Sequence, residues 1–224
     1  MRTIVLNGWA ACPELWENSH FPRERLFSYI DQMDGLPEAE LLRHCDAVLV
    51  GFSMGGSTAL RMLLDRPDLV RGLVLVSATP CMMERKDEGW RGMSERRLAA
   101  LRMGTILSAE GDSSPIFDER ELDRGLEYLR TTDLRSRLVE YSKRVAVGEL
   151  PRIPVAVIQS ERDGIVRPAN AEFLMSVFPH AKLTMVTGGE HSLPATIPDA
   201  IAKAVAECCA EAVRLFEERG ANEA

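Results

Sequence analysis

Residues 51–55, with the sequence Gly-Phe-Ser-Met-Gly, constrain this chain more than any other segment. They match the pattern Gly-x-Ser-x-Gly and separate an apolar run at 47–50 from a helical pattern at 57–64. A turn of this kind between a strand and a helix holds its central residue in a strained conformation and lifts the side chain clear of the sheet. We therefore predict that Ser53 is a nucleophile, at a helix N-terminus that favours developing negative charge.

Short apolar runs alternate with helical patterns along most of the chain. The predicted strands cover residues 2–6, 25–30, 46–51, 72–77, 154–159 and 181–187, and the predicted helices cover 37–44, 54–65, 94–107, 119–130, 133–145, 168–178 and 198–219. Several of the strands are continuous runs of Val, Ile and Leu, as expected for parallel strands that are covered on both faces. The alternation predicts an α/β fold with a mostly parallel, doubly wound sheet of about six strands.

One segment interrupts this alternation. Residues 80–150 contain no convincing strand and are helical, polar and rich in arginine. The segment leaves the sheet after the fourth predicted strand and returns to the fifth, so it lies at the edge where such sheets bind ligands. We predict a helical cap over residues 80–150, inserted into a core formed by residues 1–79 and 151–224. The alternative is that the segment only covers one face of the sheet.

Composition excludes several classes of protein. A net charge of −7 argues against nucleic acid as a main partner, and no apolar run approaches the length of about 18 residues that a membrane span requires. The first predicted strand begins at Arg2, which leaves no room for a signal peptide. The five cysteines are odd in number and lack framework spacing, which indicates free thiols. We expect a cytoplasmic protein that is a monomer or a weak dimer.

A serine hydroxyl needs a base within hydrogen-bond reach before it becomes a good nucleophile. His191 follows the last predicted strand, so it lies at the same edge of the sheet as Ser53, and we predict that it is this base. The other three histidines are predicted to be surface residues: His20, His44 and His180.

The base needs a carboxylate that orients the imidazole and stabilises its charged form. Asp163 follows the strand predicted at 154–159, although an Asp-Gly pair is also a common plain turn. Glu161 is the alternative acid. Asp163 is preferred because it lies farther into the loop, which leaves enough chain to reach the histidine.

Acyl transfer also requires two N–H donors for the oxyanion. One is predicted to be the amide of Met54, directly after the nucleophile. The other is predicted to be the amide of Trp9, because Gly8 allows a sharp turn after the first strand. The Trp9 side chain is a candidate wall of the substrate pocket, or a core aromatic residue, and these two roles are compatible.

Several short strings together resemble one known superfamily. They are Asn-Gly-Trp at 7–9, Gly-Phe-Ser-Met-Gly-Gly at 51–56, Ser-Ala-Thr-Pro-Cys at 77–81, Leu-Arg-Met-Gly-Thr at 101–105, Gly-Leu-Glu-Tyr-Leu at 125–129, Thr-Asp-Leu-Arg at 132–135 and Asp-Gly-Ile-Val at 163–166. The chain resembles the α/β-hydrolase superfamily over almost its whole length, and the order Ser53, Asp163, His191 is the order of that fold. Within the superfamily it most resembles the pimeloyl-acyl-carrier-protein methyl ester esterases of biotin synthesis.

This resemblance implies a serine carboxylic-ester hydrolase that needs no metal or organic cofactor. It also implies that arginines of the cap bind an acidic carrier protein. Residues 85–102 carry six cations against three anions, an excess that suits an acidic partner. Arg96, Arg97 and Arg102 are the predicted contacts. The alternative is that these arginines form a solvated helix face.

The chain also departs from the pattern it resembles. The first loop begins with Asn7 and Gly8 where the superfamily usually has His-Gly, and residues 31–35 replace its usual Gly-rich segment. The antiparallel strands at the N-terminus are missing and the cap is short. A general short-chain carboxylesterase or thioesterase, a lyase or acyltransferase, and a catalytically inactive binding protein therefore remain as alternatives.

Overall fold

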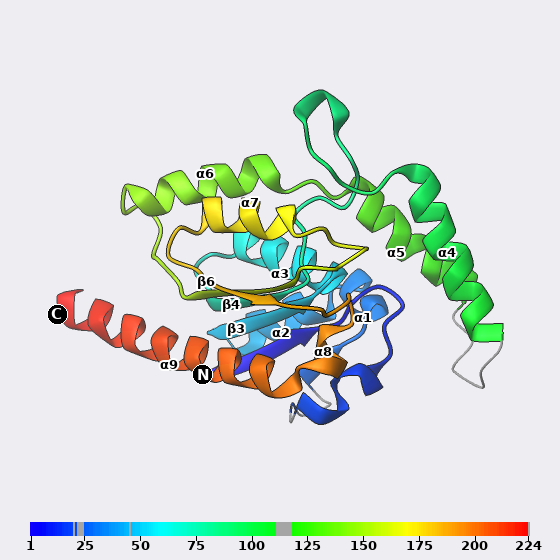
Figure 1. Ribbon diagram of the computed structural model, residues 1–224. Coiled ribbons are helices and arrows are strands. Elements are labelled where there is room, and N and C mark those ends of the chain that lie inside the picture. Colours follow the sequence, from blue (N-terminus) through cyan, green and yellow to red (C-terminus); the bar gives the residue numbers. More distant parts are fainter. Residues whose placement is uncertain (20, 22–24, 45, 111–117, 224) are drawn as a thin grey trace.

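The computed structural model describes residues 1–19, 21, 25–44, 46–110 and 118–223 (Figure 1). Its strands are β1 (Arg2–Leu6), β2 (Leu26–Phe27), β3 (Ala47–Phe52), β4 (Val70–Val76), β5 (Val155–Ser160) and β6 (Lys182–Val186). They form one sheet in the order β2-β1-β3-β4-β5-β6, and every neighbouring pair is parallel. The predicted α/β class and parallel sheet are confirmed. The order reverses between β1 and β3, so ligands are expected at the carboxyl ends of these two strands.

The second strand is much shorter than predicted. Instead of residues 25–30, only Leu26–Phe27 pair with β1. Ser28 caps the helix α1 (Tyr29–Met33): its hydroxyl accepts from the Asp31 N–H at 3.2 Å, and its own N–H donates to the Asp31 carboxylate at 2.8 Å. This reciprocal pair is a capping box, and it makes a helix more favourable here than a longer edge strand.

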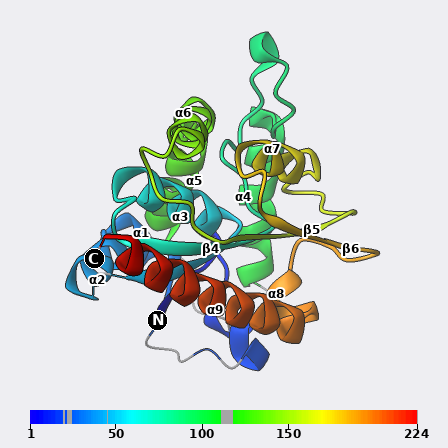
Figure 2. The ribbon, with the colours of Figure 1, turned by 90° about the vertical axis from the view of Figure 1, so that its left-hand side faces the viewer.

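Helices cover both faces of the sheet (Figures 1 and 2). On one face, side chains of α2 (Leu36–His44), α3 (Met54–Asp65), α6 (Arg135–Ala146) and α7 (Ala169–Val177) pack on alternate strand residues such as Leu49. On the other face, η1 (Pro13–Ser19), α8 (Leu193–Thr196) and α9 (Pro198–Glu223) pack on the intervening residues, such as Val50. The sheet is therefore doubly wound, as predicted. None of the helices within the described ranges is long and apolar enough to cross a bilayer.

The segment between β4 and β5 contains η3 (Lys86–Glu88), α4 (Glu95–Glu110), α5 (Glu119–Thr131) and α6. Figure 1 shows α4 and α5 projecting beyond one end of the sheet, whereas α6 returns across it. Leu138 and Tyr141 of α6 belong to the core cluster on the α3 face of the sheet. The cap at residues 80–150 stays a prediction in its boundaries, and α6 is the part of that range that packs with the core.

Candidate active site

Ser53 occupies the turn between β3 and α3 in a left-handed backbone conformation, with φ 53° and ψ −117°. Two glycines permit this turn. A Cβ on Gly51 would lie 2.6 Å from the carbonyl oxygen of Gly55 and from the Cα of Gly56, which is far inside van der Waals contact. Ser53 is buried, and its strained backbone between two closely packed glycines has the geometry of the strand-to-helix turn that the sequence predicted.

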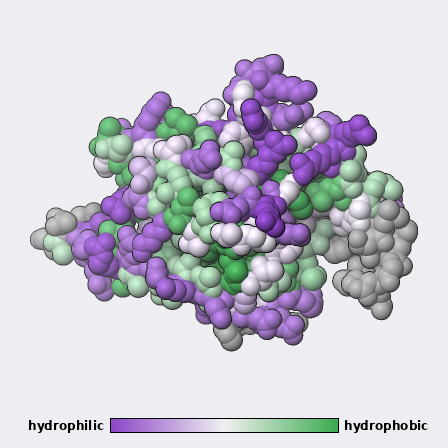
Figure 3. Space-filling model, in the orientation of Figure 1, coloured by the Kyte–Doolittle hydropathy of each residue, from purple (hydrophilic) through white to green (hydrophobic). Residues whose placement is uncertain are grey.

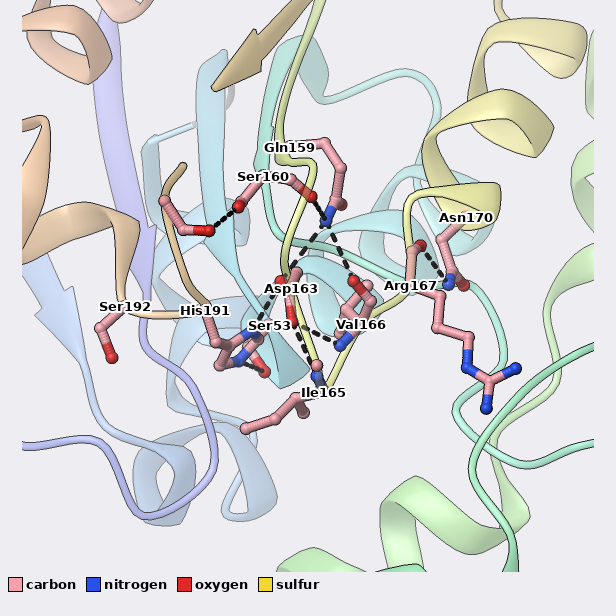
Figure 4. Close-up of polar contacts among 12 residues, drawn as sticks. Ser53, Gln159, Ser160, Asp163, Ile165, Val166, Arg167, Asn170, His191 and Ser192 are labelled. Atoms are coloured by element: carbon pink, nitrogen blue, oxygen red, sulfur yellow. Dashed lines mark hydrogen bonds and ion pairs between the residues drawn. The ribbon is translucent and has the colours of Figure 1, made fainter. Parts of the chain in front are cut away.

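His191 contacts the serine hydroxyl directly (Figure 4). It lies between β6 and α8, and its Nε2 is 2.9 Å from the Oγ of Ser53. Its ring packs against that of Phe52, with the ring centroids 5.0 Å apart. This packing limits rotation of the imidazole, so its second nitrogen has a fixed direction.

Asp163 is the group that meets that second nitrogen. One carboxylate oxygen lies 2.8 Å from His191 Nδ1, and the other accepts the backbone N–H groups of Ile165 and Val166, each at 2.8 Å. Burial alone would raise the pKa of Asp163, but the hydrogen bonds and the charge of His191 outweigh it and lower the pKa. Glu161, the alternative acid, is exposed. The structure brings together the three side chains of the predicted triad.

A serine that sequence reasoning missed joins the acid loop to the histidine loop. The hydroxyl of Ser160 donates to the carbonyl of Gly189 and accepts from the Arg162 N–H at 3.1 Å. Gln159 closes the acid loop by donating to the Val166 carbonyl at 3.0 Å. Both side chains are buried at the end of β5, and in the sequence they read only as the last residues of a strand.

Two backbone N–H groups close to Ser53 are the candidates for the oxyanion hole. Met54 begins α3, so its N–H has no intrahelical partner, and within the described part of the chain neither it nor the Trp9 N–H has a hydrogen-bond acceptor. A Cβ on Gly8 would lie 3.3 Å from the Cβ of Ser53, so the loop after β1 lies against Ser53. The two predicted oxyanion donors therefore flank the serine.

Asn7 explains how this loop forms without the usual His-Gly. Its side chain is fully buried, and its Oδ1 accepts the Gly8 N–H and the Trp16 indole N–H, each at 3.0 Å. Its Nδ2 donates to the carbonyls of Ala11 and Cys12, at 2.8 and 3.3 Å. An amide offers both donors and acceptors, so one side chain closes the loop from both sides. The Gly8 N–H is thereby occupied, whereas the Trp9 N–H has no acceptor among the described residues.

Apolar side chains from the segment between β4 and β5 pack against the start of α3. Met54 packs in one buried cluster with side chains from the segment between β4 and β5, namely Met82, Met83, Met93, Leu98, Leu122, Leu126 and Leu129. The Trp9 ring packs against this cluster, and its indole N–H donates to the carbonyl of Leu122 in α5 at 3.0 Å. Methionine and leucine side chains suit an uncharged, flexible acyl group.

The three predicted carrier contacts have different surroundings. Arg97 donates to the Gly164 carbonyl in the acid loop, and Arg102 binds Asp123 at 2.5 and 2.9 Å and Glu119 at 3.1 Å. Arg96 is exposed and has no partner among the described residues. Among these three arginines, Arg96 alone presents an uncommitted guanidinium within the described ranges.

Two of the remaining histidines, His44 and His180, have partners other than Ser53. His44 is an exposed residue that pairs with Glu40 at 3.3 Å. His180 is half-buried rather than a plain surface residue: its Nε2 is 2.9 Å from the Ile153 carbonyl, and burial lowers its pKa. His20 falls outside the described residues.

A family model described as "Alpha/beta hydrolase family" matches residues 12–204. The chain belongs to the alpha/beta hydrolase family. The matched range contains Ser53, Asp163 and His191, and the resemblance that the sequence strings predicted is confirmed.

Two relatives of this hydrolase carry the same name, pimeloyl-[acyl-carrier protein] methyl ester esterase. The one from Yersinia enterocolitica is 28% identical over 186 residues, covering 72% of this chain and 68% of the relative. The one from Salmonella paratyphi A is 25% identical, covering 90% of this chain and 91% of the relative.

Solved structures share the fold of this hydrolase. An esterase from Exiguobacterium antarcticum superposes with a TM-score of 0.69 at 17% identity, covering 92% of this chain and 91% of the other. The enol-lactonase from Burkholderia xenovorans superposes with a TM-score of 0.65 at 19% identity, covering 94% and 92%. Their different activities show that the fold does not fix the substrate.

Proposed function

We propose that this hydrolase is a serine carboxylic-ester hydrolase that removes the methyl group from pimeloyl-acyl-carrier-protein methyl ester in cytoplasmic biotin synthesis. The observation that carries the proposal is the pair of hydrogen bonds through His191, at 2.9 Å to Ser53 and 2.8 Å to Asp163. This arrangement is the one that serine hydrolases of unrelated folds share. The names of the two relatives support the choice of substrate.

In the first half of the reaction, the Ser53 oxygen attacks the ester carbonyl carbon while its proton passes to His191 Nε2. The tetrahedral oxyanion accepts the N–H groups of Trp9 and Met54. The bond from the carbonyl carbon to the methoxy oxygen then breaks. His191 gives its proton to that oxygen, methanol leaves, and the acyl group stays on Ser53.

The second half repeats these steps with water. His191 removes a proton from the water molecule, whose oxygen attacks the acyl carbon. The bond to Ser53 breaks, the proton returns to the serine oxygen, and the free acid leaves. Asp163 remains a carboxylate throughout and stabilises the imidazolium, which its lowered pKa favours.

We assign residues 80–150 to the cap of this enzyme, and Arg96 to the docking of an acidic carrier. The exposed Arg96 has no competing carboxylate among the described residues, whereas a carrier would have to displace Asp123 from Arg102. Figure 3 shows hydrophilic residues over much of this face of the molecule, but it is the excess of cations over residues 85–102 that favours an acidic partner. Charge complementarity of this kind raises the rate of association and orients the partner.

The Ser53→Ala variant tests the mechanism. Loss of the nucleophile is expected to lower kcat by at least about 10⁴-fold while the protein stays folded. The matched control is Ser192→Ala, since Ser192 is exposed and points away from His191 in Figure 4. Activity of Ser53→Ala at the wild-type level would refute the mechanism.

The substrate is tested separately, by comparing kcat/KM for a carrier-linked methyl ester with kcat/KM for p-nitrophenyl esters of increasing chain length. A clear preference for the carrier-linked ester supports the proposal. Equal or lower values would favour the second candidate, a general short-chain carboxylesterase or thioesterase. The engagement of Arg97 and Arg102 by groups of the protein itself is the observation that favours this second candidate.

A further inference from the structure

We propose that Trp9 is a positioning residue that couples the seating of the cap to the oxyanion hole. The Trp9 indole is hydrogen-bonded to α5, and this contact fixes the direction of the Trp9 backbone N–H. The inference rests on the proposed function, because it takes that N–H as an oxyanion donor. It goes beyond that function by making the stabilisation of the transition state depend on the position of α5, a helix of the cap.

The contact between Trp9 and α5 is close and specific. The indole N–H donates to the Leu122 carbonyl at 3.0 Å, although the two residues are 113 positions apart in the chain. A Cβ on Gly125, one turn farther along α5, would lie 2.6 Å from the Trp9 Cδ1 and 3.0 Å from its Nε1. The ring therefore lies flush against the helix backbone, and glycine at position 125 is what allows it.

The loop around Trp9 is strained and needs support from both sides. Ala10 has a φ of 52°, a left-handed conformation that a residue with a Cβ adopts at a cost. On one side, Asn7 holds the loop by donating to the Ala11 carbonyl at 2.8 Å. On the other side, the hydrogen bond from the Trp9 indole anchors the loop to the cap. Release of the indole would leave the Trp9 N–H free to rotate away from Ser53.

Contacts independent of Trp9 hold α5 on the body of the protein. The Tyr128 hydroxyl lies 3.3 Å from the Thr58 hydroxyl on α3, and Arg124 binds both the Asp34 carboxylate and the Met33 carbonyl at 2.8 Å. These contacts define one seated position of α5. Through the Trp9 side chain, the position of α5 determines the position of the loop after β1. If the cap is displaced, the Trp9 N–H moves and the oxyanion hole becomes weaker.

The test is a double-mutant cycle on Trp9→Ala and Gly125→Ala. Both changes leave the Trp9 backbone N–H in the chain but disturb its anchor, and each is expected to lower kcat about 10- to 100-fold, somewhat less than complete loss of an oxyanion donor. Active enzyme is counted by fluorophosphonate labelling, and thermal unfolding is recorded for every variant. Gly220→Ala is the matched control, because a Cβ there meets nothing within 4 Å.

The cycle separates coupling from general damage. Once the Trp9 ring is gone, the nearest neighbour left to the new Cβ of Gly125→Ala is the Tyr29 Cδ2 at 3.2 Å, a contact that a shift of a few tenths of an ångström relieves. The double variant should therefore match the kcat of Trp9→Ala within about twofold. An equal loss from Gly125→Ala in both backgrounds would overturn the inference, as would wild-type kcat in Trp9→Ala. A decrease that falls on KM alone would also overturn it. These results leave the proposed function unchanged, because its mechanism is tested by Ser53→Ala and its substrate by the comparison of ester substrates.

Discussion

The backbone of Gly55 lies directly against the carbonyl group of Leu6. A Cβ on Gly55 would be 2.1 Å from the Leu6 oxygen and 2.5 Å from the Leu6 carbonyl carbon. Leu6 ends β1 and Gly55 lies in the first turn of α3, so this approach sets the distance between the loop after β1 and Ser53. Both partners are backbone, and neither can turn aside as a flexible side chain would.

A methyl group at this point is therefore expected to separate the two halves of the site. We predict that Gly55→Ala lowers the free energy of unfolding by about 3 kcal/mol or more, at the upper end of overpacking effects, and that it lowers kcat as well. Urea unfolding and ester hydrolysis measure the two effects. Gly220→Ala, on the exposed surface of α9, is the control, and it should be neutral or stabilise the protein by up to about 1 kcal/mol. Equal stabilities of the two variants would contradict this account.

Local patterns in the sequence predicted the elements that make the site. The helix expected at residues 54–65 is α3, and the carboxyl ends of three predicted strands lead to Ser53, Asp163 and His191. Each of these predictions depends on a turn or a strand end that neighbouring residues determine. The strand expected at 25–30 is present only at Leu26–Phe27, because Ser28 and Asp31 form a capping box that starts a helix, a local signal stronger here than apolar content.

Contacts between distant segments could not be predicted in the same way. Residues 85–102 do carry more cations than anions. This excess alone does not predict that Arg97 binds the Gly164 carbonyl or that Arg102 binds Asp123. The indole of Trp9 meets α5 only because the segment after β4 folds back over the first loop. Such partners follow from the path of the chain in space, which no residue pattern within one segment encodes.

The hydrogen bonds by which Asn7 holds the loop after β1 can be tested by mutation. Asn7→Ala leaves the buried Gly8 N–H and the Trp16 indole N–H without acceptors, each at a cost of about 1–3 kcal/mol, so the free energy of unfolding should fall by about 2–6 kcal/mol. Chemical denaturation measures this loss. The matched variant Asn18→Ala changes an exposed asparagine of η1 and should stay close to the wild type. A similarly small effect at Asn7 would show that its buried amide does not hold the loop.

The buried carboxylate of Asp163 predicts how stability responds to acid. Its pKa is lower in the folded chain than the value of about 3.9 for an unfolded aspartate, so its charge stabilises the folded state above about pH 4. That contribution is lost as the pH falls through the folded-state pKa. Asp163→Asn has no proton to take up, so the gap in unfolding free energy between wild type and variant should narrow below about pH 4. Urea unfolding at a series of pH values measures the gap, and a gap that stays constant would contradict the prediction.

Arg96 provides the sharpest test of carrier docking. Because it is exposed and has no partner among the described residues, Arg96→Ala should leave stability unchanged. Loss of one charge from a docking surface should raise KM for the carrier-linked ester by about 5- to 10-fold, more at low salt than at high salt, and leave KM for a p-nitrophenyl ester unchanged. The matched control is Arg214→Ala, on α9, whose side chain pairs with Glu218 at 2.5 Å. If both variants shift KM for the carrier-linked ester equally, the effect comes from net charge and Arg96 is not a specific contact.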